Sequence, residues 1–200
     1  MTKFYKINFN AEGEPDMWHL RYPIDEFGKI MDASMLPDRG PYVGPRIDKV
    51  QIDTRYPGRA LDFNFGYFNF LLIQSWVADI IEIHGGNIQR YPVTLEPTKE
   101  VGYEVIFTLN APEGLIDLTR AEEYEFYEED DSKIKMCYGG VPPRQKGMLY
   151  KIYGLHIDSE KAKGMEFFRP WEYPVLIISD ALKLAFEAAG VTGIAYRLVS

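Results

Sequence analysis

Near the end of the chain, hydrophobic and polar positions follow one another in blocks that predict a strand, a helix and a second strand. Val175–Ile178 is an apolar, largely β-branched run, which is typical of a buried strand. Ser179 is suited to cap a following helix, because its hydroxyl can accept a hydrogen bond from a free N–H of the first turn. Ala181–Ala189 consists of helix formers and core residues, and Gly190 supplies a left-handed residue that ends the helix. Ile194–Val199 then predicts a returning strand.

The charged positions of this helix predict how much of it is buried. Asp180, Lys183 and Glu187 fall on one narrow stripe, with Asp180 in the first turn, where the helix dipole favours a negative charge. We therefore expect the helix to be covered over most of its circumference, with Phe186 in the core.

The same order of elements occurs earlier, in residues 70–95. An apolar run leads to Ser75, which stands where Ser179 stands later and is expected to cap a second helix. A glycine pair at 85–86 ends that helix, and Tyr91 opens the next strand. The chain is therefore expected to contain a duplicated strand–helix–strand unit.

The distribution of these patterns predicts how the chain is organised. No low-complexity linker divides it, so we expect a single domain over residues 1–200. Within it we distinguish an irregular N-terminal part at 1–60, the first strand–helix–strand unit at 70–95, a strand-rich middle at 101–155 and the second unit at 173–200. Many alternating strands against two helices predict an α+β fold, with a mixed, largely antiparallel sheet and two Ser-capped helices packed on it.

Shorter patterns place the remaining elements. Apolar and polar residues alternate or run together over several short segments, which predicts strands. These strands are Phe4–Phe9, Lys49–Asp53, Val101–Leu109, Leu115–Leu118, Ile134–Tyr138 and Met148–Leu155, the last pairing back across the loop at 139–147. Asp158 is expected to cap a short helix over Ser159–Lys163.

The net charge and the cysteine content of the chain make some classes of function less consistent with the sequence than others. The chain has 22 basic and 30 acidic residues and a net charge of −8, which argues against a nucleic-acid binder and fits a basic protein partner. Cys137 is alone, so no internal disulfide and no cysteine metal site are expected. The first residues lack the apolar core of a signal peptide and no run has membrane-spanning length, which predicts a cytoplasmic protein without a membrane partner.

The residues that most often carry chemistry do not form a recognisable set. His19, His84 and His156 are far apart and lack ligand spacing, so we expect neither a metal site nor a cofactor. The two helix-capping serines do not lie in a nucleophile elbow. Asp62 and Asp117 would form a carboxylate pair only if the fold brought them together.

An acidic section at 120–131 stands out against this background, and its pattern fits either a helix or an exposed strand. Carboxylates and aromatic residues, Phe126 among them, are interleaved, which is typical of a docking surface, where acids steer a basic partner and aromatics anchor it. The other interpretation is a solvated face whose aromatic side chains are tucked into the core. For the docking surface, the candidate partner-binding residues are Glu122, Glu123, Tyr124, Glu125, Tyr127, Glu128, Glu129, Asp130 and Asp131.

The whole chain resembles immunity family eleven of bacterial polymorphic toxin systems, formerly a domain of unknown function. The similarity is strongest at the C-terminal end, and it also covers the segments around Trp18, Asp62 and Asp117. After Asp117 the chain departs from the family pattern, because Leu118-Thr119-Arg120 replaces an acidic-then-serine run. The residues that carry the closing pattern are Phe168, Arg169, Ser179, Leu182, Phe186, Gly190, Gly193 and Tyr196.

The resemblance implies a protein that binds a cognate toxin in the producing cell and neutralises it stoichiometrically, without catalysis of its own. Inhibition of this kind requires a large complementary surface. Two alternatives remain open: a small enzyme whose site is assembled from distant carboxylates and a histidine, and a structural or regulatory interaction module.

Overall fold

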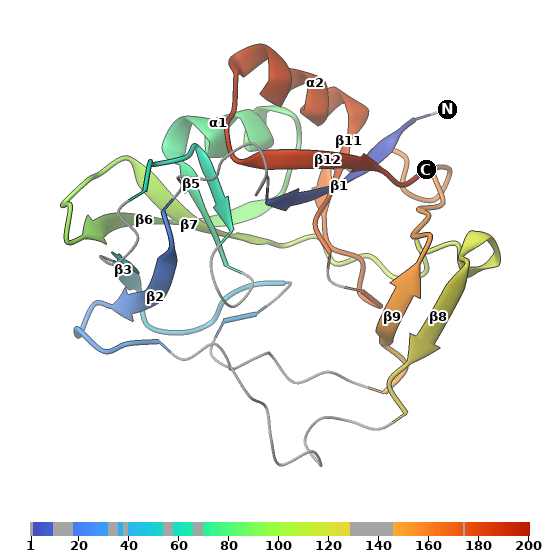
Figure 1. Ribbon diagram of the computed structural model, residues 1–200, viewed down its shortest axis with the longest axis horizontal. Coiled ribbons are helices and arrows are strands. Elements are labelled where there is room, and N and C mark those ends of the chain that lie inside the picture. Colours follow the sequence, from blue (N-terminus) through green and yellow to red (C-terminus); the bar gives the residue numbers. More distant parts are fainter. Residues whose placement is uncertain are drawn as a thin grey trace.

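Figure 1 shows the computed structural model of the chain, in which two helices lie together over one side of the β-sheets. The structure describes residues 2–9, 18–31, 36–37, 40–53, 58–65, 70–128, 146–173 and 175–200. Among them, no helix is both long enough and apolar enough to cross a membrane. The fold is α+β with mixed, largely antiparallel sheets, as the sequence predicts.

The C-terminal unit consists of β11 (Ile177–Ser179), α2 (Asp180–Ala189) and β12 (Ile194–Leu198). Its two strands run parallel but do not touch, because β1 (Phe4–Phe9) lies between them and pairs antiparallel with both. The predicted cap of α2 is confirmed, since the Leu182 N–H donates to Ser179 Oγ at 3.1 Å. Gly190 ends the helix in the left-handed region, with φ 72°.

The first unit repeats this arrangement with β5 (Leu71–Gln74), α1 (Ser75–Ile83) and β6 (Ile88–Glu96). Here β7 (Tyr103–Thr108) is the antiparallel strand between the two parallel ones. The inserted strand follows the unit in sequence, whereas β1 precedes the second unit. The duplicated element is therefore a split strand–helix–strand unit, and α1 and α2 pack against each other.

The predicted cap of α1 is wrong. The helix begins one residue earlier than expected, with Gln74 at the cap position and no side-chain bond to the first turn. Ser75 is already helical, and its hydroxyl donates to the carbonyl of Gly102 at 3.0 Å. The tight turn before β7 therefore engages the hydroxyl that would otherwise serve the helix.

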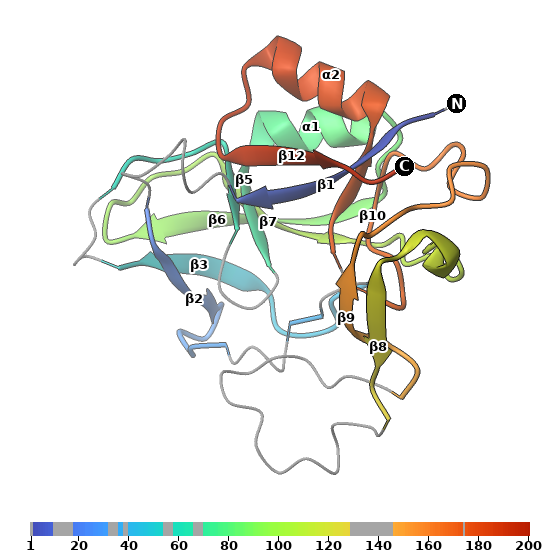
Figure 2. The same cartoon turned by 45° about the vertical axis from the view of Figure 1, so that its right-hand side comes forward.

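The two units belong to different sheets. A six-stranded sheet has the order β2-β3-β6-β7-β5-β4, and it adds β2 (Leu20–Asp25), β3 (Ile47–Ile52) and β4 (Phe63–Phe65) to the first unit. Within it only β3 and β6 are parallel neighbours. A four-stranded sheet has the order β10-β11-β1-β12, where β10 is Phe167–Phe168. A separate pair of strands, described below, completes the described part of the fold (Figures 1 and 2).

One hydrophobic core, called here the shared core, joins both sheets and both helices. It takes Ile7 from β1, Ile106 from β7, Val77 from α1 and Phe186 from α2. The opposite face of each sheet has a core of its own, so both sheets bury apolar residues on both faces. Phe4 lies in the core behind the four-stranded sheet, whereas Ile7 lies in the shared core, which places the two faces of β1 in different environments.

The prediction that α2 is covered over most of its circumference is wrong. Leu182 and Phe186 are its buried residues, whereas Leu184 is 56% exposed. The uncharged positions outside the buried stripe are mostly alanines, which favour the helix through propensity and do not require burial. A narrow charged stripe therefore does not imply a wide buried one.

Three local predictions also need correction. The sequence predicts no strand over residues 20–25 in the irregular N-terminal part; β2 forms there, at the edge of its sheet, where Pro23 is tolerated. Leu115–Leu118 forms a single bridge from Ile116 to Ile157, not a strand. Asp158 accepts from the N–H groups of Glu160 and Lys161, as a cap would, but the segment is a turn. The expected strand at 134–138 lies outside the described residues.

Candidate functional site

Part of the acidic section, residues 123–126, forms an exposed strand. β8 (Glu123–Phe126) pairs antiparallel with β9 (Leu149–Tyr153), and all four β8 residues are exposed. We call this strand pair the acidic ribbon; Figures 1 and 2 both place it at the side of the molecule away from the helices. The sequence left open whether this segment is a helix or an exposed strand, and for residues 123–126 the strand is correct.

One face of the acidic ribbon is polar. Glu123 lies opposite Tyr153, and Glu125 lies opposite Lys151. The Lys151 ammonium donates to Glu123 at 2.7 Å and lies 3.8 Å from Glu125, and it also lies 4.8 Å from the centre of the Tyr153 ring. The hydrogen bond to Glu123 raises the pKa of Lys151. Two of the predicted carboxylates are therefore already paired within the ribbon.

The other face of the acidic ribbon carries aromatic side chains. Tyr124 and Phe126 alternate with the acids and contact each other edge to face, with ring centres 5.6 Å apart. They are 44% and 42% exposed, so they are not tucked into a core. Tyr127 is half-buried and packs on Tyr150 at 5.3 Å. An exposed aromatic pair of this kind is the feature that anchors protein interfaces.

The remaining predicted residues divide into two groups. Glu122 and Glu128 are exposed, and neither side chain forms an ion pair within the described residues. Glu129, Asp130 and Asp131 lie outside the described residues. The ribbon thus places Glu122 before its first strand and Glu128 after it, so that two unpaired carboxylates flank the aromatic face.

Asp62, one half of the candidate carboxylate pair, has a structural role. It accepts from the backbone N–H of Thr192 at 3.0 Å and from the Thr192 hydroxyl at 2.7 Å. The neighbouring Gly193 has φ 96°, and a Cβ there would collide with the carbonyl of Phe63. Asp62 therefore fastens the loop before β12 to the start of β4.

Asp117, the other half, shapes a local turn. It accepts from the N–H and the hydroxyl of Thr119, at 3.1 and 2.6 Å, and so caps a short 3₁₀ helix over Leu118–Arg120. The hydrogen bond from the Thr119 hydroxyl holds the pKa of Asp117 below its usual range. Within the described residues no hydrogen bond or ion pair joins it to Asp62, and no three acidic, histidine or cysteine side chains gather as metal ligands would.

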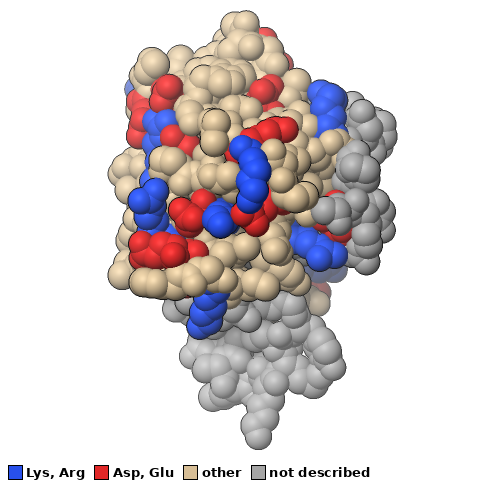
Figure 3. Space-filling view, turned by 90° about the vertical axis from the view of Figure 1, so that its left-hand side faces the viewer, with Lys and Arg blue, Asp and Glu red and all other residues tan. Residues whose placement is uncertain are grey.

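Among the described residues, a further group of charges lies between α1 and the six-stranded sheet. Arg90 contacts Glu104 at 2.5 Å, Asp79 at 2.7 Å and Glu82 at 2.6 Å. Its pKa is raised chiefly by the hydrogen bond to Glu104. Because it ties the helix to both strands beneath, we assign Arg90 to the architecture of the first unit. Acids and bases are likewise interspersed over the face shown in Figure 3.

Two basic residues that the sequence did not single out face the acidic ribbon. Lys6 on β1 and Arg197 on β12 are direct neighbours across the strand pair, although almost the whole chain separates them. They line a pocket together with Tyr153 from the end of β9. The alternation of β1 predicts that Lys6 points away from Tyr5 and Ile7, but nothing in the sequence predicts that the first and last strands pair.

Comparison with known families does not assign the chain. No protein-family model matches it, and a search of curated proteins finds no match either.

Proposed function

We propose that this chain is an immunity protein that binds a cognate bacterial toxin in the cytoplasm and neutralises it by stoichiometric protein–protein inhibition. The proposal is supported by the resemblance of the closing unit to immunity family eleven and by one structural observation. That observation is the acidic ribbon, which presents an aromatic pair on a strand exposed along its whole length.

The chemistry of the acidic ribbon fits this role. Tyr124 and Phe126 offer apolar area with little conformational freedom to lose on binding, which suits anchor residues. Glu122 and Glu128 flank them and have no partner cation within the described residues, so their charge is available to attract a basic surface. Anchoring is thus supplied by side chains of β8, and steering by the residues that flank this strand.

The enzyme alternative gains no comparable support. Asp62 and Asp117 each accept hydrogen bonds from a threonine in their own part of the fold, which gives each carboxylate a structural role. An interaction module without a toxin partner would use the same exposed ribbon. A toxin gene next to the gene for this chain would distinguish the two, because immunity proteins act on a cognate toxin.

The test is to identify a toxin gene beside the gene for this chain and to measure binding of its toxin domain in a kinetic assay at two ionic strengths. Glu128→Lys is expected to slow association by roughly a factor of a few and to flatten its salt dependence, because the charge acts by steering. Replacing both aromatics, Tyr124→Ala with Phe126→Ala, is expected mainly to speed dissociation, because anchors act in the bound state.

Glu100→Lys is the matched control, since it makes the same charge change on an exposed residue beside the turn before β7. It should leave association nearly unchanged. Melting curves of Glu128→Lys and Glu100→Lys should agree closely with that of the parent protein, because exposed single charges contribute little to folding. The aromatic variant is compared only if its melting curve shows that it is folded. The ribbon is not the binding surface if Glu128→Lys and the aromatic variant both bind like the parent protein. Absence of any binding to the adjacent toxin would reject the proposed function itself.

A further inference from the structure

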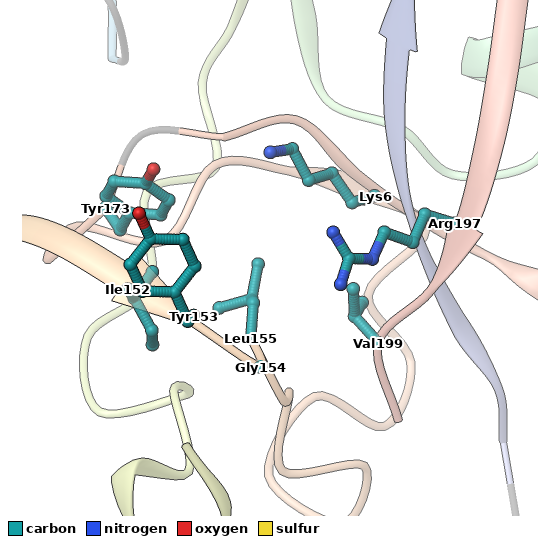
Figure 4. Close-up of a pocket in the computed structure, with 8 residues that line it drawn as sticks. All are labelled: Lys6, Ile152, Tyr153, Gly154, Leu155, Tyr173, Arg197 and Val199. Atoms are coloured by element: carbon teal, nitrogen blue, oxygen red, sulfur yellow. The ribbon is translucent and has the colours of Figure 1, made fainter. Parts of the chain in front are cut away.

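A small pocket lies between the acidic ribbon and the four-stranded sheet (Figure 4), with a cavity volume of about 60 Å³ that is partly open to solvent. Lys6 and Arg197 extend into it from β1 and β12, and Tyr153 and Tyr173 line it on the side of the ribbon. Leu155 and Val199 contribute apolar wall. The pocket therefore combines two cations, two phenol hydroxyls and a dry surface.

The two cations are placed against each other. Lys6 and Arg197 occupy directly opposite positions of an antiparallel pair, where like charges are destabilising. Within the described residues neither side chain forms an ion pair or a hydrogen bond, although the chain has an excess of acids. Other cations of the fold do have carboxylate partners: Arg21 pairs with Asp53, and Lys183 pairs with Glu187.

The surroundings of Lys6 add to the unfavourable placement. Burial lowers its pKa, and the charge of Arg197 lowers it further. A half-buried ammonium beside an exposed guanidinium, with no anion among the described residues to offset them, costs stability, and a bound anion would relieve that cost.

We propose that this pocket binds a phosphate group, as inorganic phosphate or at the end of a small molecule. A phosphate carries nearly two negative charges at neutral pH and several acceptor oxygens. Lys6 and Arg197 match the charge, and the hydroxyls of Tyr153 and Tyr173 can donate to further oxygens. A carboxylate would leave one of the two positive charges without a counter-charge.

The site goes beyond the proposed function and does not depend on it. The residues that line the pocket come from β1, β12, the end of the acidic ribbon and the segment around Tyr173. An anion held by all four parts joins the ribbon to the four-stranded sheet. Occupancy therefore fixes the position of the surface that carries the exposed aromatic residues.

The experiment is a titration of the intact protein with inorganic phosphate at constant ionic strength, followed by amide chemical shifts and by calorimetry. Saturable binding is expected, with shifts concentrated in β1, β12 and residues 152–155. Lys6→Met and Arg197→Gln should each weaken phosphate binding by about tenfold or more, because each removes a charge-assisted hydrogen bond. Tyr153→Phe combined with Tyr173→Phe should weaken phosphate binding less, because the rings stay in place and only the hydroxyls are lost.

Lys29→Gln is the charge-matched control, since Lys29 is exposed and lies beyond the end of β2. It should not change phosphate affinity. A melting curve identifies any variant that fails to fold, and the tyrosine double variant preserves the test in that case. The proposal is wrong if sodium chloride at equal ionic strength produces the same shifts, if Lys29→Gln weakens binding as much as Lys6→Met, or if acetate binds as tightly as phosphate.

Discussion

Replacing Phe186 with alanine is the most direct test of how the two halves of the fold are joined. Phe186 is fully buried on α2, in the shared core to which both sheets contribute. Its ring packs edge to face on the ring of Phe63, which lies on β4 of the six-stranded sheet, with ring centres 6.3 Å apart. Removing a buried phenyl ring loses its transfer free energy and leaves a cavity, which together cost about 3–5 kcal/mol. We expect Phe186→Ala to lower the free energy of unfolding by that amount.

The same helix supplies a matched control. Leu184→Ala also truncates an apolar side chain to alanine, but Leu184 is 56% exposed. Its expected effect is within about 0.5 kcal/mol, because little burial is lost and alanine favours the helix. Both changes in the free energy of unfolding are to be measured by denaturant unfolding, with the same dependence on denaturant concentration used for all variants.

A double-mutant cycle separates the ring contact from the rest of the cavity. Combining Phe186→Leu with Phe63→Leu is expected to give a coupling energy of about 0.5–1.5 kcal/mol, the range for aromatic pairs. A loss below about 1 kcal/mol for Phe186→Ala, or an equal loss for Leu184→Ala, would refute the assignment of this residue to the shared core.

Two further predictions concern the helix caps and the paired cations. Ser179→Ala should destabilise by about 1 kcal/mol in denaturant unfolding, because it removes the acceptor of the Leu182 N–H, whereas Ser75→Ala should have a smaller effect because Ser75 caps nothing; equal losses would contradict this. The pKa of Lys6 is lower in the folded protein than in the unfolded chain. The charge of Lys6 therefore destabilises the folded state fully at pH values below the folded pKa. This destabilisation disappears as the pH rises towards the ordinary pKa of 10.5. Lys6→Met should therefore be more stable than the parent at neutral pH, and this advantage should shrink in urea unfolding at alkaline pH. The groups that face Lys6 (Arg197, Tyr153 and Tyr173, with Glu122 against Gly154) are present in both proteins, so the difference reports the burial of the Lys6 charge together with its interactions with these groups, the repulsion from Arg197 among them. A variant that is less stable at every pH would contradict the sign.

Elements with local signals could be predicted from the sequence. Ser179, the alanine-rich run and Gly190 together define α2, because cap, propensity and stop signal act within a few residues. Ser75 has the same local context but bonds to Gly102, 27 residues away, which no local rule anticipates. β2 could not be predicted either, because a strand tolerates a proline such as Pro23 only at the edge of a sheet, and the local sequence does not show which strand lies at an edge.

The candidate site divides in the same way. The alternation of acids and aromatics at 122–127 is local and gives the two faces of the ribbon once the segment is known to be a strand. The assignment to a strand depends on β9, which lies beyond residue 145. Lys6 and Arg197 could not be recognised as a pair, because their proximity results from the pairing of the first strand with the last.

The position of β1 also determines the order in which the chain can be assembled during synthesis. β1 is made first, yet both strands that pair with it begin at Ile177 or later. The first unit contains β5, α1, β6 and β7 within residues 71–108, so it can form while the rest of the chain is still being translated. The four-stranded sheet cannot be completed until β12 has been made, and until then backbone groups and apolar side chains of β1 lack these partners. A chaperone that holds the nascent N-terminal strand would protect this protein during that interval, and loss of the final strand through premature termination would leave β1 without half of its partners.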